Sequence, residues 1–424
     1  MGKIKAIVRT PLFKVTSLNS ISVILKISIG LITSKVLAFF IGPAGMALTG
    51  NLRNFLTSLE NITTLGFQNG IVKYIVEHKN DNYELKKIIS TVFLSLLLIS
   101  FVLSGVLFAF ASFWNEFILD NNYNYINIFK ILALVLPWYA VTIFLLAVIN
   151  GLGRFKSVIY INIIGNILGL IFAVVMIWQF KTFGALLSII IPPSLLFFVA
   201  FYFINKEIRF LKHISFSLFD FQIIKNLSSY SLMALVSSVV GPLVFLSIRN
   251  NIITTLGIEQ AGYWESMNRI ATYYFMFVST IMSVYFLPRL ALVTSKKATK
   301  KVFKSYYTSI VPFFILGLIV LYFLRFFIVH LLFTKDFMPV TDLFLWQFLG
   351  DIFKVMSLIL GYQFFAKKLT IAFIITEVLS LSLMYSLSYF FMPIFGIQGV
   401  VMAHALNYIV YFLILTVYFR KTLF

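Results

Sequence analysis

The chain has 424 residues, of which 61% are hydrophobic and only 11% are charged, and its mean hydropathy is +0.99. These values lie far outside the range of soluble globular domains, so the sequence predicts an all-α integral membrane protein without a sizeable soluble domain. The chain has no cysteine, which excludes disulfides, thiolate chemistry and cysteine-bound metals. The net charge of +20 indicates a kind of partner only when the positions of the cations along the chain are known.

Apolar stretches long enough to cross a hydrocarbon core of roughly 30 Å recur from one end of the chain to the other. They predict twelve transmembrane helices. The first follows a basic N-terminal segment and has no small-residue cleavage site, so we interpret it as a retained span rather than a signal peptide. The predicted spans are residues 15–41, 45–76, 86–112, 126–150, 157–179, 184–204, 227–250, 261–288, 303–332, 340–366, 370–392 and 397–419.

The connections between these spans alternate in charge. Most of the 34 Lys and Arg residues lie at the two termini and in the even-numbered connections, as in the basic segment 296–301. The other face has only Lys130, Lys181 and Lys335 near its connections. By the positive-inside rule, both termini are predicted to be cytoplasmic. Because the cations are spread over several short segments rather than gathered in one patch with aromatic residues, a nucleic-acid partner is not expected.

A weak internal repeat divides the chain into two halves. The segment "IGPAGMALTGNLRN" at 41–54 resembles "IEQAGYWESMNRIA" at 258–271, and each copy begins a helix on the outer side. Two six-helix halves of the same orientation are typical of transporters with a central site. The alternative is a chance similarity between hydrophobic helices. The repeat predicts two six-helix lobes around a central cavity, with an N-terminal lobe at 1–204, a cytoplasmic inter-lobe connection at 205–226 and a C-terminal lobe at 227–424.

Charged residues inside the predicted spans carry the main functional signal. A charge at mid-bilayer costs about 2.5–3.5 kcal/mol even on the lenient insertion scale, so these side chains are expected to face protein or water. The cations outnumber the acids, which predicts a water-filled interior of positive potential that attracts an anion such as a phosphate group. The cations are Lys26, Lys35, Arg53, Arg249, Arg269, Arg325 and Lys354, and the acids are Glu60, Glu265, Asp351 and Glu377.

Several of these charges have a simpler structural interpretation. Glu265 with Arg269, and Asp351 with Lys354, are spaced for ion pairs within one helix, which would only neutralise each other. Cations near the outer ends of their spans are expected to snorkel toward the headgroups. This group consists of Arg249 and Arg325. We interpret His404 as a packed polar residue.

Four segments resemble the Wzx-type flippases of polysaccharide assembly. They are "FIGPAGMALTGNLRNF" at 40–55, "FQNGIVKYIVEH" at 67–78, "SVYFLPRL" at 283–290 and "DLFLWQFLGDIFKV" at 342–355. The resemblance covers nearly the whole chain and extends to O-antigen translocases and to the subgroup that moves the lipid-linked repeat of enterobacterial common antigen.

The resemblance implies a member of the multidrug/oligosaccharidyl-lipid/polysaccharide exporter superfamily, whose cavity opens alternately to either side. The implied substrate is an undecaprenyl-pyrophosphate-linked oligosaccharide, moved from the cytoplasmic to the periplasmic leaflet of a bacterial inner membrane. Membrane lipids, and a polymerase and chain-length proteins of the same pathway, are the implied partners. No enzymatic activity, cofactor or metal is expected.

The family pattern implies Lys26, Lys35, Arg53, Asp351 and Lys354 as candidates for the cavity. Lys354 would help to hold the pyrophosphate, while Asp351 tunes the charge of Lys354 or takes up a coupling proton. Arg269 comes from the internal repeat, where it falls near the place of Arg53. The substrate-binding candidates are Lys26, Lys35, Arg53, Arg269 and Lys354, and the candidates for coupling or charge tuning are Glu60, Glu265, Asp351 and Glu377.

Other functions remain open on the sequence. A peptidoglycan-precursor flippase is the nearest rival, although members of that kind usually have two further spans. A cation-coupled drug exporter of the same superfamily would be expected to have a more acidic or aromatic cavity. A membrane polysaccharide polymerase or glycosyltransferase would be expected to show a large outer loop or a metal-binding carboxylate motif, and the sequence shows neither.

Overall fold

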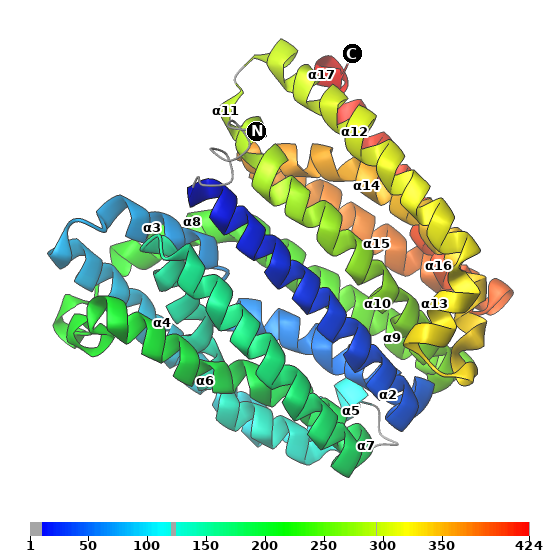
Figure 1. The fold of residues 1–424 in the computed structure, drawn as a ribbon, viewed down its shortest axis with the longest axis horizontal. Helices are drawn as coiled ribbons and strands as arrows, with labels where there is room; N and C mark the ends of the chain where they lie inside the picture. Colours follow the sequence, from blue (N-terminus) through cyan, green and yellow to red (C-terminus); the bar gives the residue numbers. More distant parts are fainter. Residues whose placement is uncertain (1–10, 120–123, 294, 424) are drawn as a thin grey trace, which may run out of the picture. The chain divides into compact units, whose positions relative to one another are not determined.

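The computed structural model describes residues 11–119, 124–293 and 295–423, with their side chains except those of residues 11–19, 69, 229–234 and 237. Throughout these ranges the chain is helical, and short turns connect the helices (Figure 1). This follows from the composition, because a backbone surrounded by hydrocarbon has to satisfy its hydrogen bonds within its own segment. The predicted all-α membrane protein is confirmed.

The number of spans also agrees with the prediction. Ten helices in the described ranges are long and apolar enough to cross a membrane. Two of them, α2 (Pro11–Thr63) and α7 (Phe155–Ile208), are each interrupted by one residue with non-helical backbone angles. These residues are Gly42, with φ 62°, and Lys181, with φ 49°. Because each interruption separates two helices, the described residues supply the twelve predicted spans.

Two spans that were predicted as continuous helices are interrupted in the structure. The span predicted at 45–76 is interrupted by a turn in which Leu65 and Gly66 have φ values of 51° and 63°, which an α-helix does not accommodate. The span predicted at 303–332 is interrupted at Leu324, beyond which Arg325 donates a side-chain hydrogen bond of 3.0 Å back to the carbonyl oxygen of Tyr322. An arginine that binds a terminal carbonyl in this way favours the end of a helix.

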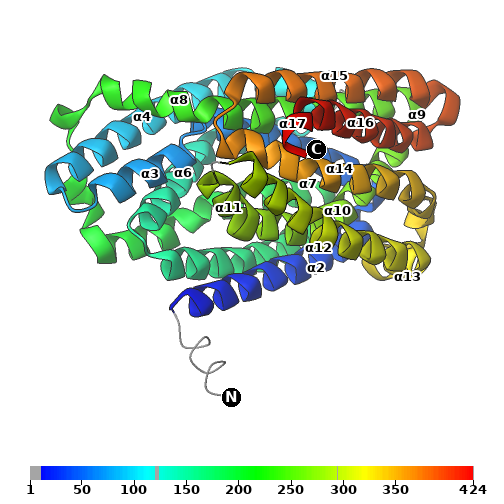
Figure 2. The ribbon, with the colours of Figure 1, turned by 90° about the horizontal axis from the view of Figure 1, so that it is seen from above.

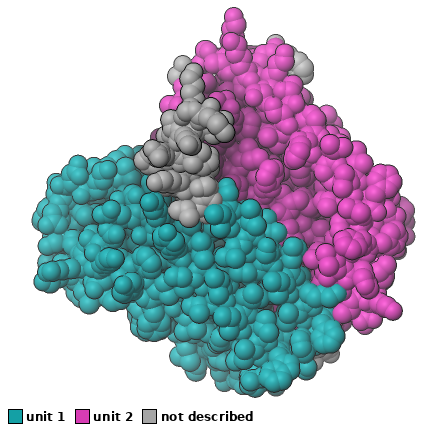
Figure 3. Space-filling view, viewed as in Figure 1, with its two compact units in different colours: residues 1–40, 51–239 teal, residues 41–50, 240–424 magenta. Residues whose placement is uncertain are grey.

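The chain forms two compact units, coloured teal and magenta in Figure 3. Unit 1 contains residues 1–40 and 51–239, and unit 2 contains residues 41–50 and 240–424. The boundary lies within the seventh predicted span, and the short segment 41–50 belongs with unit 2. The lobe boundaries that the sequence suggests, with a connection at 205–226, stay a prediction.

In unit 1, α6 is the central helix and packs against α3, α4 and α7 (Figure 1). The core around it consists of aliphatic and aromatic side chains, including Phe144, Val148 and Ile149, each 1% exposed or less. Besides the two parts of α2 and helix α7, the elements of unit 1 are α3 (Gln68–His78), α4 (Asn82–Ala109), α5 (Ala111–Leu119), α6 (Ile126–Gly151), η1 (Phe210–His213), η2 (Phe216–Leu218) and α8 (Phe221–Leu235).

The segment between α7 and α8 folds back onto α4. Ser90 donates a hydrogen bond of 2.9 Å to the carbonyl oxygen of His213 and accepts one of 3.0 Å from the backbone amide of Ser215. The ammonium of Lys87 lies 2.7 Å from a carboxylate oxygen of Asp220. This hydrogen bond holds the pKa of the Asp220 carboxyl below its ordinary value. The segment is therefore fixed to α4 near its middle and at its C-terminal end.

In unit 2, α16 packs along both α14 and α15, which lie beside it in Figure 2. The π-helical turns η3 (Val236–Val240), which crosses from unit 1 into unit 2 along the sequence, and η4 (Met282–Phe286) each precede a proline-containing helix start. The elements of this unit are α9 (Gly241–Leu256), α10 (Ile258–Ile281), η4, α11 (Leu287–Leu292), α12 (Lys296–Phe323), α13 (Arg325–Leu332), η5 (Lys335–Leu343), α14 (Phe344–Ala366), α15 (Thr370–Phe395), α16 (Ile397–Tyr418) and α17 (Arg420–Leu423).

Glycines allow two pairs of backbones in unit 2 to approach closely. A β-carbon on Gly262 in α10 would collide with the backbone carbonyl of Pro43, and one on Gly350 in α14 would collide with His404 and meet the α-carbon of Ala405 at 3.0 Å. The first contact joins the two copies of the internal repeat, because Pro43 and Gly262 come from its N-terminal and C-terminal copies respectively. Small residues at such crossings permit the tight packing on which membrane helices depend.

We predict that Gly262→Ala lowers the thermal stability of the detergent-purified protein, because a backbone carbonyl cannot move away from the added methyl group without shifting a helix. Overpacking of this kind costs about 1–3 kcal/mol. Gly361→Ala is the matched control, since nothing lies within 4 Å of a β-carbon at that position in α14. Tryptophan fluorescence during heating measures both variants, and equal melting temperatures would contradict the prediction.

Candidate functional site

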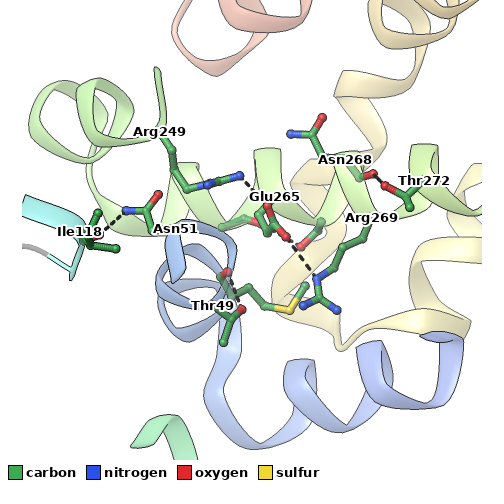
Figure 4. Close-up of polar contacts among 11 residues, drawn as sticks. Thr49, Asn51, Ile118, Arg249, Glu265, Asn268, Arg269 and Thr272 are labelled. Carbon is green, nitrogen blue, oxygen red and sulfur yellow. Dashed lines mark hydrogen bonds and ion pairs between the residues drawn. The ribbon is translucent and has the colours of Figure 1, made fainter. Parts of the chain in front are cut away.

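A cluster of two arginines and one glutamate lies inside unit 2, and we call it the arginine–glutamate cluster. Arg249 of α9 places Nη2 2.6 Å from Oε2 of Glu265 in α10, and Arg269, one turn further along α10, places Nε 3.4 Å from the other carboxylate oxygen (Figure 4). All three side chains are at most 7% exposed. The Glu265–Arg269 pair that the sequence spacing allows is therefore present, and a second cation joins it.

The burial of Arg249 contradicts the prediction that this residue snorkels. Its side chain is 1% exposed, and its guanidinium lies over the ring of Trp264 with 5.2 Å to the ring centroid. A β-carbon on Gly50 would meet both Glu265 and Arg249, so the segment 41–50 also packs against this pair. The carboxylate of Glu265 on the neighbouring helix α10 pairs with the Arg249 guanidinium. Residue spacing within α9 does not predict this partner.

A second polar cluster surrounds Asp351, and we call it the Asp351 network. The Asp351 side chain is fully buried. The hydroxyl of Tyr274 in α10 donates to Oδ2, Gln347 donates to the same oxygen over 3.1 Å, and Nε2 of His404 in α16 lies 2.9 Å from Oδ1. Three helices thus supply partners to a single carboxylate. The interpretation of His404 as a merely packed polar residue is incomplete, because it bonds directly to Asp351.

Lys354 does not form the ion pair with Asp351 that the spacing allows. Its ammonium lies over the ring of Phe275, 4.3 Å from the centroid, and near the ring of Tyr408, at 5.3 Å. The side chain is half-buried rather than enclosed. The physical reason is that donors from other residues already occupy the carboxylate oxygens of Asp351, whereas aromatic faces offer the lysine a cation–π contact.

Glu377 lies in α15, the helix that follows the helix of Lys354 in the sequence. It accepts a hydrogen bond of 3.4 Å from the hydroxyl of Tyr411 in α16, the helix whose Tyr408 lies near Lys354. The structure therefore brings Asp351, Lys354 and Glu377 into one region of unit 2. It also shows that aromatic side chains, rather than acids, make the direct contacts of the lysine.

The candidates of unit 1 lie along α2. Glu60 accepts a hydrogen bond of 2.5 Å from the Tyr139 hydroxyl and a longer one of 3.4 Å from Gln68. Arg53, about two turns before Glu60, is half-buried. Lys26 and Lys35, in the first helix of α2, have exposed side chains.

Several residues of these clusters were not candidates in the sequence analysis. Tyr139, Tyr274 and His404 each bond to an acid from a different helix, so only the fold reveals their partners. The one sequence signal was that each of these acids lies within an apolar span and requires a partner there. Among the described residues, no group of His, Cys, Asp and Glu is arranged to hold a metal ion.

Comparison with known proteins decides the family. Residues 12–293, well over half of the chain, match the family model described as "Polysaccharide biosynthesis protein". The chain belongs to this family. Its relatives include the lipid III flippases of Escherichia coli (strain K12) and Shigella flexneri, each 29% identical over 404 residues, which cover 95% of this chain and 96% of the relative. The resemblance to polysaccharide flippases inferred from the sequence is confirmed.

The fold of this chain is similar to those of solved membrane transporters. An inward-facing multidrug resistance MATE family transporter of the MOP superfamily has a TM-score of 0.76 at 14% identity, with 94% of this chain and 98% of that chain covered. The lipid II flippase MurJ, in an inward closed conformation, has a TM-score of 0.68 at 17% identity, with coverages of 97% and 89%. At these identities the likeness shows the fold alone.

We predict that Glu265→Gln destabilises the protein more than Arg249→Met does. Removing the glutamate charge leaves two guanidinium groups buried beside each other, whereas removing Arg249 leaves Glu265 with Arg269. Removing one partner of a buried ion pair, so that the other charge is left uncompensated, lowers the free energy of unfolding by about 3–5 kcal/mol. Melting temperatures measured in the same detergent show which of the two variants is less stable. A larger loss in Arg249→Met would show that the packing of the guanidinium on Trp264, rather than the charge balance, dominates this cluster.

Proposed function

We propose that this protein is a flippase that moves an undecaprenyl-pyrophosphate-linked oligosaccharide from the cytoplasmic to the periplasmic leaflet of a bacterial inner membrane. Its family, the names of its relatives and its transporter fold support this proposal. The substrate is an O-antigen or enterobacterial common antigen repeat unit. Transport proceeds by alternating access and requires no enzymatic step.

The observation that carries the proposal is the environment of Lys354. This lysine lies within an apolar span, yet its ammonium contacts aromatic rings instead of the nearby Asp351 carboxylate. Because that carboxylate is held by Tyr274 and by two other side chains, it leaves the positive charge of Lys354 for an incoming anion. A half-buried cation beside aromatic faces suits a sugar pyrophosphate, since the ammonium attracts the phosphates and the rings stack against apolar sugar faces.

The remaining candidates take complementary roles in this proposal. Lys26, Lys35 and Arg53 of unit 1, together with Arg269 of unit 2, add positive charge for the pyrophosphate. Glu60, Glu265, Asp351 and Glu377 tune these charges or take up a coupling proton. Substrate binding would neutralise repulsion among the cations and so shift the conformational equilibrium, provided that the contacts are stronger in one state than in the other.

The charge of the connections supports the proposed orientation, in which both termini are cytoplasmic. Membrane lipids surround the protein on every side. The polymerase and the chain-length proteins of the same assembly pathway are its proposed protein partners, because they would consume the translocated repeat unit.

Reconstitution tests the function directly. We expect purified protein in liposomes to expose the headgroup of an undecaprenyl-pyrophosphate oligosaccharide at the far leaflet, as measured with an impermeant glycan-modifying enzyme. The same vesicles loaded with a cationic dye, and vesicles with an undecaprenyl-pyrophosphate muramyl peptide, test the drug-exporter and peptidoglycan-precursor alternatives. Headgroup exposure at the same rate in protein-free vesicles would refute the flippase proposal.

We predict that Lys354→Met lowers the rate of headgroup exposure about 10- to 100-fold, because a hydrogen bond to a charged group contributes about 1.5–3 kcal/mol. The double variant Asp351→Asn with Lys354→Met should be no better, since neutralising the pair cannot restore a phosphate donor. Lys335→Met, an exposed lysine of the same unit, is the matched control. Transport by the double variant close to that of the unmodified protein would assign Asp351 and Lys354 a purely structural role.

A further inference from the structure

Unit 1 carries an apolar groove of about 320 Å³ that lies apart from the charged clusters described above. It is formed by α4, α6, the last part of α7 and η1, which pack against one another in this unit. Some lining side chains are buried, with Val141 and Phe210 at most 6% exposed, while its rim is open, with Phe101, Leu134 and Trp138 more than half exposed. The groove is therefore a concave surface on which an apolar chain gains contacts that a flat helix face does not offer.

One end of the groove is bounded by η1, which ring packing and hydrogen bonds hold against α4 and α7. Phe210 of η1 packs against Phe93 and Phe201, with ring centroids 5.5 Å and 6.3 Å apart. The hydrogen bonds of Ser90 fix the end of η1 to α4. Because η1 directly follows the transmembrane helix α7, this end lies where the chain leaves the hydrocarbon.

Acids near this end are already neutralised within the unit. Glu207 in the last turn of α7 lies 2.7 Å from Arg154, and Asp220 lies 2.7 Å from Lys87. The surplus charge next to the groove is therefore positive, and it belongs to residues that flank the groove-lining Phe210 and Leu211.

The two flanking cations are exposed and hold no ion pair with any residue that the structure describes. Arg209 ends α7 in a left-handed conformation, with φ 47° and ψ 60°, which turns the chain so that η1 covers the end of the groove. Lys212 follows within η1. An apolar groove with free basic groups at the membrane interface has the charge and shape of a phospholipid site.

We propose that this groove binds an anionic phospholipid of the bilayer, with one acyl chain along Phe101, Leu134 and Trp138 and the phosphate at Arg209 and Lys212. The volume suits one chain and lies at the low end of the range for ligand sites, roughly 300–1,000 Å³. The site is independent of the transported substrate. A bound lipid would join α4, α6 and α7 and cover the exposed rim of the groove.

Quenching of Trp138 by brominated lipids tests this site in the full chain. In vesicles of phosphatidylcholine, small amounts of brominated phosphatidylglycerol or brominated phosphatidylcholine are added, and the signal of the Trp138→Phe variant is subtracted to isolate Trp138. We expect half-maximal quenching of Trp138 at a mole fraction about five times lower for phosphatidylglycerol. In Arg209→Gln with Lys212→Gln the two lipids should quench alike.

The matched control is Lys206→Gln with Lys225→Gln, which removes the same charge from neighbouring positions that do not flank the groove. It should keep the preference for phosphatidylglycerol. If both double variants lost the preference for phosphatidylglycerol equally, the preference would come from general surface electrostatics, and the proposal would be overturned. Equal quenching by both lipids in the unmodified protein, or stronger quenching by brominated undecaprenyl phosphate than by phosphatidylglycerol, would also overturn it, the latter by assigning the groove to a polyprenyl chain.

Discussion

The cost of placing a charge among membrane-spanning helices governs the structure of this protein. Glu265 and Asp351 show two solutions to that cost. Glu265 is held between two arginines, so its cluster keeps one surplus positive charge, whereas Asp351 receives donors from α10, α14 and α16 and needs no cation from its own helix. In both cases a buried carboxylate depends on partners from other helices, which is why these clusters define how α9, α10, α14 and α16 pack.

The partners of each charge also distinguish charges that stabilise the fold from charges that could bind a transported substrate. Arg249 is enclosed and paired, and its role in holding α9 against α10 follows from its geometry. Lys354 is half-buried and rests on aromatic rings, which stabilise the cation without neutralising it. In the proposed function, such a cation keeps more attraction for an anionic substrate than a cation that is enclosed and paired.

Close backbone contacts give the helices around these clusters a fixed spacing. Gly50 and Gly262 lie where a side chain would prevent the segment 41–50 from reaching α10, and Gly350 lies where α14 meets α16 beside Asp351. The tight crossing at Gly350 brings His404 within hydrogen-bonding distance of Asp351. Packing and electrostatics are therefore linked, since the loss of one small residue would also move a buried ion pair or hydrogen bond.

The sequence alone determined the membrane setting, the helical class, the twelve spans and the family resemblance, because these depend on composition, span length and local motifs. It also identified Glu265, Arg269, Asp351 and Lys354 as charges that require an explanation, since each lies in an apolar stretch. Only the tertiary structure decided their partners. The bonds of Asp351 to Tyr274 and His404, and of Glu265 to Arg249, join different helices, and helical spacing reports only neighbours within one helix.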